Sequence, residues 1–165
     1  MDSILDRNGC RANNAGKPPD ETMSTPHPIP DRHGQNLFTG DDELKRLLAL
    51  YLPADLLAHL TPHFERLGAL AGGPLDELAA TADRHPPTLE QRTRTGLDLQ
   101  RIVKHPAYVE MERLGYAEFA MGSVSHRDET FGWKGKLPPA VKYVLFLLFV
   151  QAEFGLCCPI SMTDS

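Results

Sequence analysis

Hydrophobic side chains recur at helical spacing through the first half of the chain. The first stripe puts four of them at i, i+3, i+4 and i+7, on one helix face: Leu44, Leu47, Leu48 and Tyr51. Thr39 or Asp41 can cap this helix, and its acidic first turn suits the positive end of the helix dipole. Two more stripes follow, each behind a proline that favours a helix start: Leu56, Leu57 and Leu60 after Pro53, then Phe64, Leu67 and Leu70 after Pro62. We therefore expect Thr61-Pro62 to separate two helices.

A short helix is expected next, from Pro74 to about Asp83. The segment behind it is polar and has no helical stripe. Leu97, Leu99 and Val103 fall on alternating positions there, and Gly96 marks a turn, which predicts an extended stretch or a small hairpin near 89–103.

The C-terminal third of the chain carries its most apolar pattern. A helix beginning at Pro106 has one buried face, and a second one, over 139–154, is apolar nearly all round, as expected for a helix buried on all sides. Pro159 and Ser161 resemble the start of a further helix. The preceding helices can cover one side of the 139–154 helix, so its other side needs a partner subunit or further domains. We therefore expect an all-α domain that is incomplete at its C-terminus.

Composition adds limits to this picture. Residues 1–35 are rich in Pro, Asn, Gly, Ser and Thr, and are predicted to be a disordered tail before a helical domain over 36–165. The net charge of −5 argues against direct nucleic-acid binding by this segment. The apolar run at 143–150 is far shorter than the roughly 20 residues of a membrane span. Three cysteines and no visible export signal favour the cytoplasm.

Candidate chemistry is sparse. His59 and His63 have i, i+4 spacing, but the expected break at Thr61-Pro62 would separate their faces, so no metal site is predicted. No catalytic residue is predicted either. The remaining candidates are more simply explained by packing or by solvated loops: the adjacent Cys157 and Cys158, and His126 near Ser123 or Ser125. Trp133, in FGWKGK, is either a loop anchor or a residue that stacks on a ligand.

Several phrases in order resemble the N-terminal part of the acyl-CoA dehydrogenase superfamily, closest to its DNA-alkylation-response (AidB-like) branch. They are PHPIP, NLF, HPAY, a buried helix ending in QAEFG, and CPISMT, over roughly Pro26 to Thr163. The resemblance implies an all-helical N-terminal domain of an oligomeric oxidoreductase that uses FAD in its full-length form. The flavin phrase T-E-x-x-G-G-S-D of that family is absent here. Cofactor-binding residues therefore stay unassigned, Met162 and Thr163 included, and no FAD is expected for this chain alone.

Two functions are consistent with these patterns. The first is the N-terminal portion of an AidB-like flavoprotein, a packing and pocket-wall domain that is inactive alone and whose partners are the missing C-terminal domains. The alternative is a free-standing helical interaction module that homodimerises through the 139–154 helix.

Overall fold

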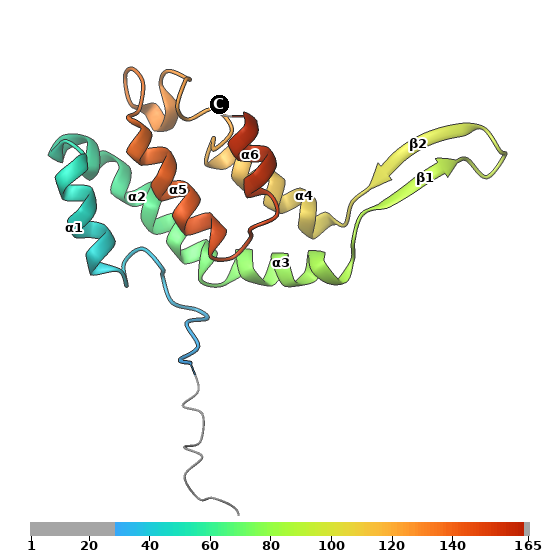
Figure 1. Cartoon of the computed structure of the whole chain (residues 1–165), viewed down its shortest axis with the longest axis horizontal. Coiled ribbons are helices and arrows are strands. Elements are labelled where there is room, and N and C mark those ends of the chain that lie inside the picture. The colour runs from blue at the N-terminus through green and yellow to red at the C-terminus, as the bar shows by residue number, and fades with distance from the viewer. Residues whose placement is uncertain (1–28, 164–165) are drawn as a thin grey trace, which may run out of the picture. The chain divides into compact units, whose positions relative to one another are not determined.

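The computed structural model describes residues 29–163 and shows a helical domain with one small antiparallel hairpin (Figure 1). Residues 32–163 belong to one compact unit. Most of the predicted tail, residues 1–28, lies outside the described residues. The elements, in order, are α1 (Asp42–Tyr51), α2 (Ala54–Ala71), α3 (Pro74–Arg84), β1 (Thr88–Arg92), β2 (Asp98–Val103), α4 (Pro106–Glu112), the π-helical η1 (Arg113–Glu118), the 3-10 turn η2 (Thr130–Gly132), α5 (Pro139–Val150) and α6 (Cys157–Thr163).

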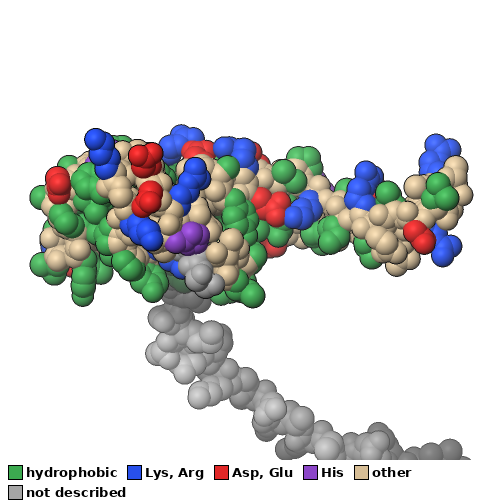
Figure 2. Space-filling view, turned by 90° about the horizontal axis from the view of Figure 1, so that it is seen from above, with side chains coloured by type: hydrophobic (Ala, Val, Ile, Leu, Met, Phe, Trp, Pro, Cys, Tyr) green, Lys and Arg blue, Asp and Glu red, His purple; other side chains and the backbone are tan. Residues whose placement is uncertain are grey.

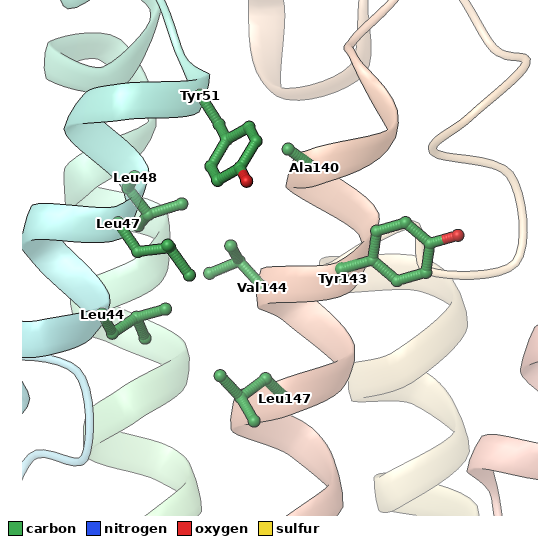
Figure 3. Close-up of a pocket in the computed structure, with 8 residues that line it drawn as sticks. All are labelled: Leu44, Leu47, Leu48, Tyr51, Ala140, Tyr143, Val144 and Leu147. Carbon is green, nitrogen blue, oxygen red and sulfur yellow. The ribbon is translucent and has the colours of Figure 1, made fainter.

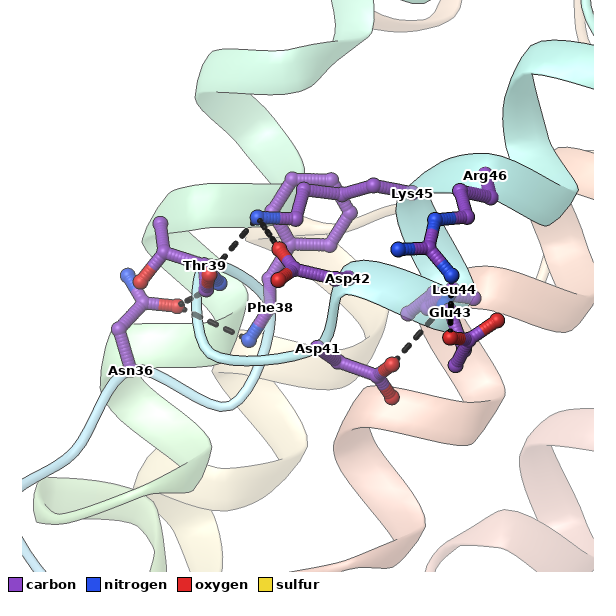
Figure 4. Close-up of polar contacts among 9 residues, drawn as sticks. All are labelled: Asn36, Phe38, Thr39, Asp41, Asp42, Glu43, Leu44, Lys45 and Arg46. Carbon is purple, nitrogen blue, oxygen red and sulfur yellow. Dashed lines mark hydrogen bonds and ion pairs between the residues drawn. The ribbon is translucent and has the colours of Figure 1, made fainter.

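The first helix begins where its sequence predicts. Asp41 is the N-cap of α1, and its side chain accepts a hydrogen bond from the amide of Leu44 at 2.9 Å (Figure 4). Asn36 arranges the approach to it, because its Oδ1 accepts from the amides of Phe38 and Thr39 at 3.0 and 3.1 Å. Its Nδ2 donates to the carbonyl of Glu65 on α2. We call residues 34–40, just before the cap of α1, the lead-in segment. The amide side chain of Asn36 ties this segment to α2.

The lead-in segment lies against two glycines near the C-terminal end of α2. The amide of Gly34 donates to the carbonyl of Gly72 at 2.6 Å, and that of Leu37 to Gly68 at 3.0 Å. A β-carbon on Gly72 would lie 1.7 Å from the carbonyl oxygen of Gln35, so only glycine permits this approach. Gly34 and Gln35, which composition assigns to the tail, therefore lie against the end of α2.

The expected break at Thr61-Pro62 is wrong. α2 runs unbroken through both residues, and Pro62 lies exposed inside it. A proline inside a helix removes one backbone hydrogen bond and costs roughly 3 kcal/mol. The apolar face of α2 outweighs that cost, because five of its side chains are buried at helical spacing: Leu56, Leu60, Phe64, Leu67 and Ala71. Burying one large side chain of this kind contributes about 1.5–3 kcal/mol.

The core forms where α2 packs against α1, α3 and α5. On α5 the fully buried positions are Val141, Leu145, Leu148 and Phe149. α5 ends at Val150, four residues earlier than the predicted 154, because the amides of Ala152 and Glu153 both turn back to the carbonyl of Phe149. One side of this helix stays uncovered in this chain, as the sequence predicts, since Tyr143 is 69% exposed and Leu147 is 45% exposed.

The predicted hairpin is confirmed as β1 and β2, which pair antiparallel and join α3 to α4 (Figure 1). Gly96 forms its turn at φ +86°, a conformation that glycine adopts without strain. Every residue of both strands is exposed. The hairpin therefore contributes nothing to the core. None of the helices among the described residues has the length and apolarity that crossing a membrane requires.

Candidate functional site

An apolar groove lies between α1 and α5, with a volume of about 380 Å³ (Figure 3). Its floor is formed by buried side chains of the two helices, such as Leu48 and Val144. Its rim is the exposed half of the stripe on α1, where Leu47 is 51% exposed and Tyr51 is 69% exposed. Residue spacing alone predicts that stripe. Only the structure shows that α5 leaves part of it uncovered.

A second groove, of about 400 Å³, lies on the other side of Tyr143 and Leu147, which line both. α5 and the start of α6 form it, and the exposed ring of Phe154 stands at its edge. Since the two grooves share these two side chains, they make one continuous apolar surface. We call this surface the α5 face. Its members are Leu44, Leu47, Leu48, Tyr51, Ala140, Tyr143, Val144, Phe146, Leu147, Val150, Phe154, Cys157, Cys158 and Ser161.

The α5 face offers apolar contact and little else. None of the described residues that line it carries a charge at neutral pH. Burial, with smaller contributions from the nearby Glu153 and Cys158, raises the pKa of Cys157 to about 11, so this thiol stays protonated and unreactive. A surface of this kind favours contact with other apolar groups.

His59 and His63 share a helix face, contrary to the sequence prediction, because α2 continues through Pro62. Their rings lie 6.3 Å apart, and both hold the loop before α5. Nε2 of His59 donates to the carbonyl of Phe131 at 2.9 Å, and the His63 ring packs 4.5 Å from the Phe131 ring. This contact secures a strained residue, since Phe131 has φ +57°.

Trp133 packs on the first of these histidines, with its ring 5.3 Å from that of His59. Its half-buried side chain lies against the core. Of the two interpretations of this residue, the loop anchor is the one the geometry supports. Within residues 29–163 no three His, Cys, Asp or Glu side chains are grouped closely enough to hold a metal ion.

Two further sequence candidates, Ser123 and His126, make backbone contacts within their loop. The hydroxyl of Ser123 donates to the carbonyl of Ala120 at 3.4 Å, and the backbone amide of His126 donates to the carbonyl of Ser123. α6 begins at Cys157, two residues before the predicted start at Pro159. Met162 and Thr163 therefore lie in its last turn, and the hydroxyl of Thr163 donates to the carbonyl of Pro159 at 2.7 Å.

A helical domain with a continuous apolar surface is what the fold and this face define. The chain belongs to the family of the adaptive response protein AidB N-terminal domain, whose model matches residues 28–165. It is therefore part of an AidB-like protein of the acyl-CoA dehydrogenase family, as the ordered phrases in the sequence predict.

One solved structure with the same fold is described as "Bd2924 apo-form". It is 23% identical, with a TM-score of 0.68, over 82% of this chain. This chain spans only 26% of the length of that one. No curated protein matches the chain.

Proposed function

We propose that this chain serves as the N-terminal packing domain of an FAD-dependent, AidB-like acyl-CoA dehydrogenase, with no activity of its own. In the whole protein the α5 face would be covered by the domains that hold the flavin, and would form a wall of the substrate pocket. The observation that carries this proposal is the α5 face itself. Apolar grooves on adjoining sides of one helix expose more hydrophobic surface than scattered surface residues do, which is typical of an interface.

The described residues of the α5 face do not fit FAD on their own. The cofactor carries a pyrophosphate, whose negative charge is usually met by cationic side chains or by a glycine-rich turn at a helix start. The described residues of the α5 face supply hydroxyls, thiols and carbon, and no positive charge. FAD would thus be held by other parts of the full-length protein, where it supplies the oxidation of an acyl thioester. This chain would contribute only apolar contact.

The proposal depends on what the gene encodes, so the first test is the nucleotide sequence downstream of Ser165. We expect a reading frame that continues into a T-E-x-x-G-G-S-D-like phrase and a long helical region. The purified 165-residue chain should show no flavin absorbance and no acyl-CoA oxidation. The whole protein should show both. A gene that closes without the flavin phrase, or a chain that binds flavin alone, would contradict the proposal.

The second candidate is homodimerisation through the α5 face, which the self-complementary apolar surface of Tyr143 and Leu147 favours. Sedimentation of Leu147→Asp separates the two functions. The homodimer predicts a discrete dimer that becomes a monomer in this variant. If the chain is instead a packing domain, we expect no discrete dimer, and Leu147→Asp should leave the sedimentation of the chain without a dimer-to-monomer change. Leu50→Asp is the matched control, because Leu50 is 81% exposed on α1 and lines neither groove.

A further inference from the structure

The β1–β2 hairpin is the largest feature that the proposed function leaves unexplained. Figure 2 shows it leaving the helical part of the domain with basic, acidic and hydrophobic side chains all on its surface. A two-stranded hairpin is marginally stable by itself in water. This one also exposes apolar side chains, with Leu89 at 53% and Ile102 at 63%. The sheet consists of β1 and β2, so each strand pairs with a neighbour strand on one edge only, and its other edge is open. Such an edge is a ready place for another strand to pair.

The open edge of β1 is regular and presents defined backbone groups. The register changes between Glu90 and Arg92, where β2 advances three residues, from Arg101 to Asp98, while β1 advances two. The extra residue therefore lies in β2, and β1 keeps its alternation. The amide of Thr93 donates to the carbonyl of Leu97, so Thr93 turns its backbone toward β2. By alternation Gln91 does the same, and Glu90 and Arg92 turn theirs to the open edge.

The charges on this edge are self-complementary about Gln91. Glu90 and Arg92 lie on one face of β1, two positions apart. If a second β1 pairs antiparallel with Gln91 opposite Gln91, each Glu90 stands opposite Arg92 of the second copy. Glu90 and Arg92 would also be the residues that exchange backbone hydrogen bonds. A parallel pairing in register would instead oppose identical charges, which is destabilising.

The charges already inside the hairpin extend this pattern. Glu90 binds Arg101 on β2 at 2.6 Å, and Arg92 lies 3.5 Å from Asp98. Across four strands the row would therefore alternate in sign, from Arg101 to Glu90, then to Arg92 and Asp98 of the second copy. On the opposite face, Leu89 would meet Thr93 of the second copy, which covers part of the exposed apolar surface of Leu89.

We propose that two copies of this chain associate through the open edges of β1, antiparallel about Gln91, and form a four-stranded sheet. This surface is separate from the α5 face, so the inference does not depend on the proposed function. We assign a second copy of this chain as the partner of the β1 edge. Two such edges, paired antiparallel, are complementary in charge and in backbone hydrogen bonding. A two-fold axis through Gln91 closes the assembly at a dimer.

Charge reversal in one strand gives a test with its own rescue. E90R leaves only arginine at positions 90 and 92, and R92E leaves only glutamate. Each variant alone would oppose like charges twice, so we expect its dimer dissociation constant, measured by sedimentation equilibrium, to rise by about tenfold or more. An equimolar mixture opposes arginine with glutamate at both places. We expect it to recover dimers to within about threefold of the original constant.

Two controls make each outcome decisive. R94E changes the net charge as much as R92E does, but Arg94 lies in the turn, so association should stay unchanged. The same series in an L147D background removes any contribution of the α5 face. A chain that is monomeric throughout, single variants that dimerise like the original, or a mixture that stays monomeric would each overturn the proposal. A variant hairpin that simply failed to fold would also not recover on mixing, and so would count against it.

Discussion

Gly68 and Gly72 lie about one turn apart at the end of α2 and let the lead-in segment approach its backbone. A β-carbon on Gly68 would lie 2.4 Å from Oδ1 of Asn36 and 2.6 Å from the amide nitrogen of Phe38. Gly→Ala in a helix ordinarily stabilises by about 1 kcal/mol. Here we expect Gly68→Ala to lower the free energy of unfolding by about 1–3 kcal/mol, because the segment must move away. Urea denaturation measures the change. A midpoint that rises would show that the segment does not bind there.

His63 should make stability depend on pH. Partial burial lowers the pKa of its imidazole below the usual 6.5, and the nearby His59 lowers it further. The unfolded chain therefore takes up the proton more readily than the folded one. The contribution of His63 is fully present above pH 6.5 and is lost as the pH falls from there through the folded pKa.

We expect a loss on the order of 0.5 kcal/mol between about pH 7.5 and 5.5, small because the ring is partly solvated. Trp133, the only tryptophan, can report the transition by its fluorescence. His63→Phe keeps an aromatic ring against Phe131 and should remove this part of the pH dependence. If the original chain and His63→Phe lose stability equally on acidification, the assignment to His63 is wrong.

The helix α2 carries a proline that its surroundings tolerate but do not need. Pro62 is exposed, so replacing it removes no buried contact. Pro62→Ala restores a backbone donor inside the helix, and we expect it to raise the free energy of unfolding by about 1–2 kcal/mol, less than the full cost of a helical proline because the unfolded chain becomes freer.

Thermal unfolding followed by far-ultraviolet circular dichroism checks this. Pro74→Ala is the control, since Pro74 occupies the first position of α3, where no amide donor is required and little change is expected. Equal shifts for the two variants would mean that the position of a proline in its helix does not matter here.

In the chain taken as a whole, the α5 face should bind a hydrophobic dye while the protein is still folded. We expect the fluorescence of anilinonaphthalene sulfonate to fall by about half in the double variant Leu47→Ser, Leu147→Ser, because both side chains line the groove between α1 and α5. Both are about half exposed, so the free energy of unfolding should change by less than about 1 kcal/mol. Leu50→Ser, off the groove, should leave the signal unchanged. Loss of dye binding together with unfolding would point to a structural role.

Much of the architecture follows from local patterns. The stripe on α1, the cap at Asp41 and the turn at Gly96 are all local, and the helix and the hairpin form where they predict. The break at Thr61-Pro62 fails because the local preference of proline competes with a long apolar face. The strength of that face depends on what packs against it. The prediction that His59 and His63 lie on separate faces is wrong for the same reason, since they share a face only if the helix is continuous.

The candidate surface could be predicted only in part. An apolar helix near the C-terminus and the need for a covering partner are visible in the composition of residues 139–154. Which side of that helix stays uncovered depends on α1 and α6, whose contacts with α5 join residues about 100 positions apart in one case and neighbours in the other. The edge of β1 likewise could not be assigned without the pairing of the hairpin, because that pairing decides which β1 residues turn their backbone to β2 and which to the open edge.

The sequence by itself determined the helical class, the hairpin, the family and the expected excess of apolar surface, because these depend on residue type and short-range spacing. The tertiary structure alone decided that α2 is continuous, that the two histidines anchor a loop, and that Tyr143 and Leu147 stay exposed. These features arise from packing between distant segments, where many small contacts outweigh a local preference. Spacing along the chain does not report such contacts.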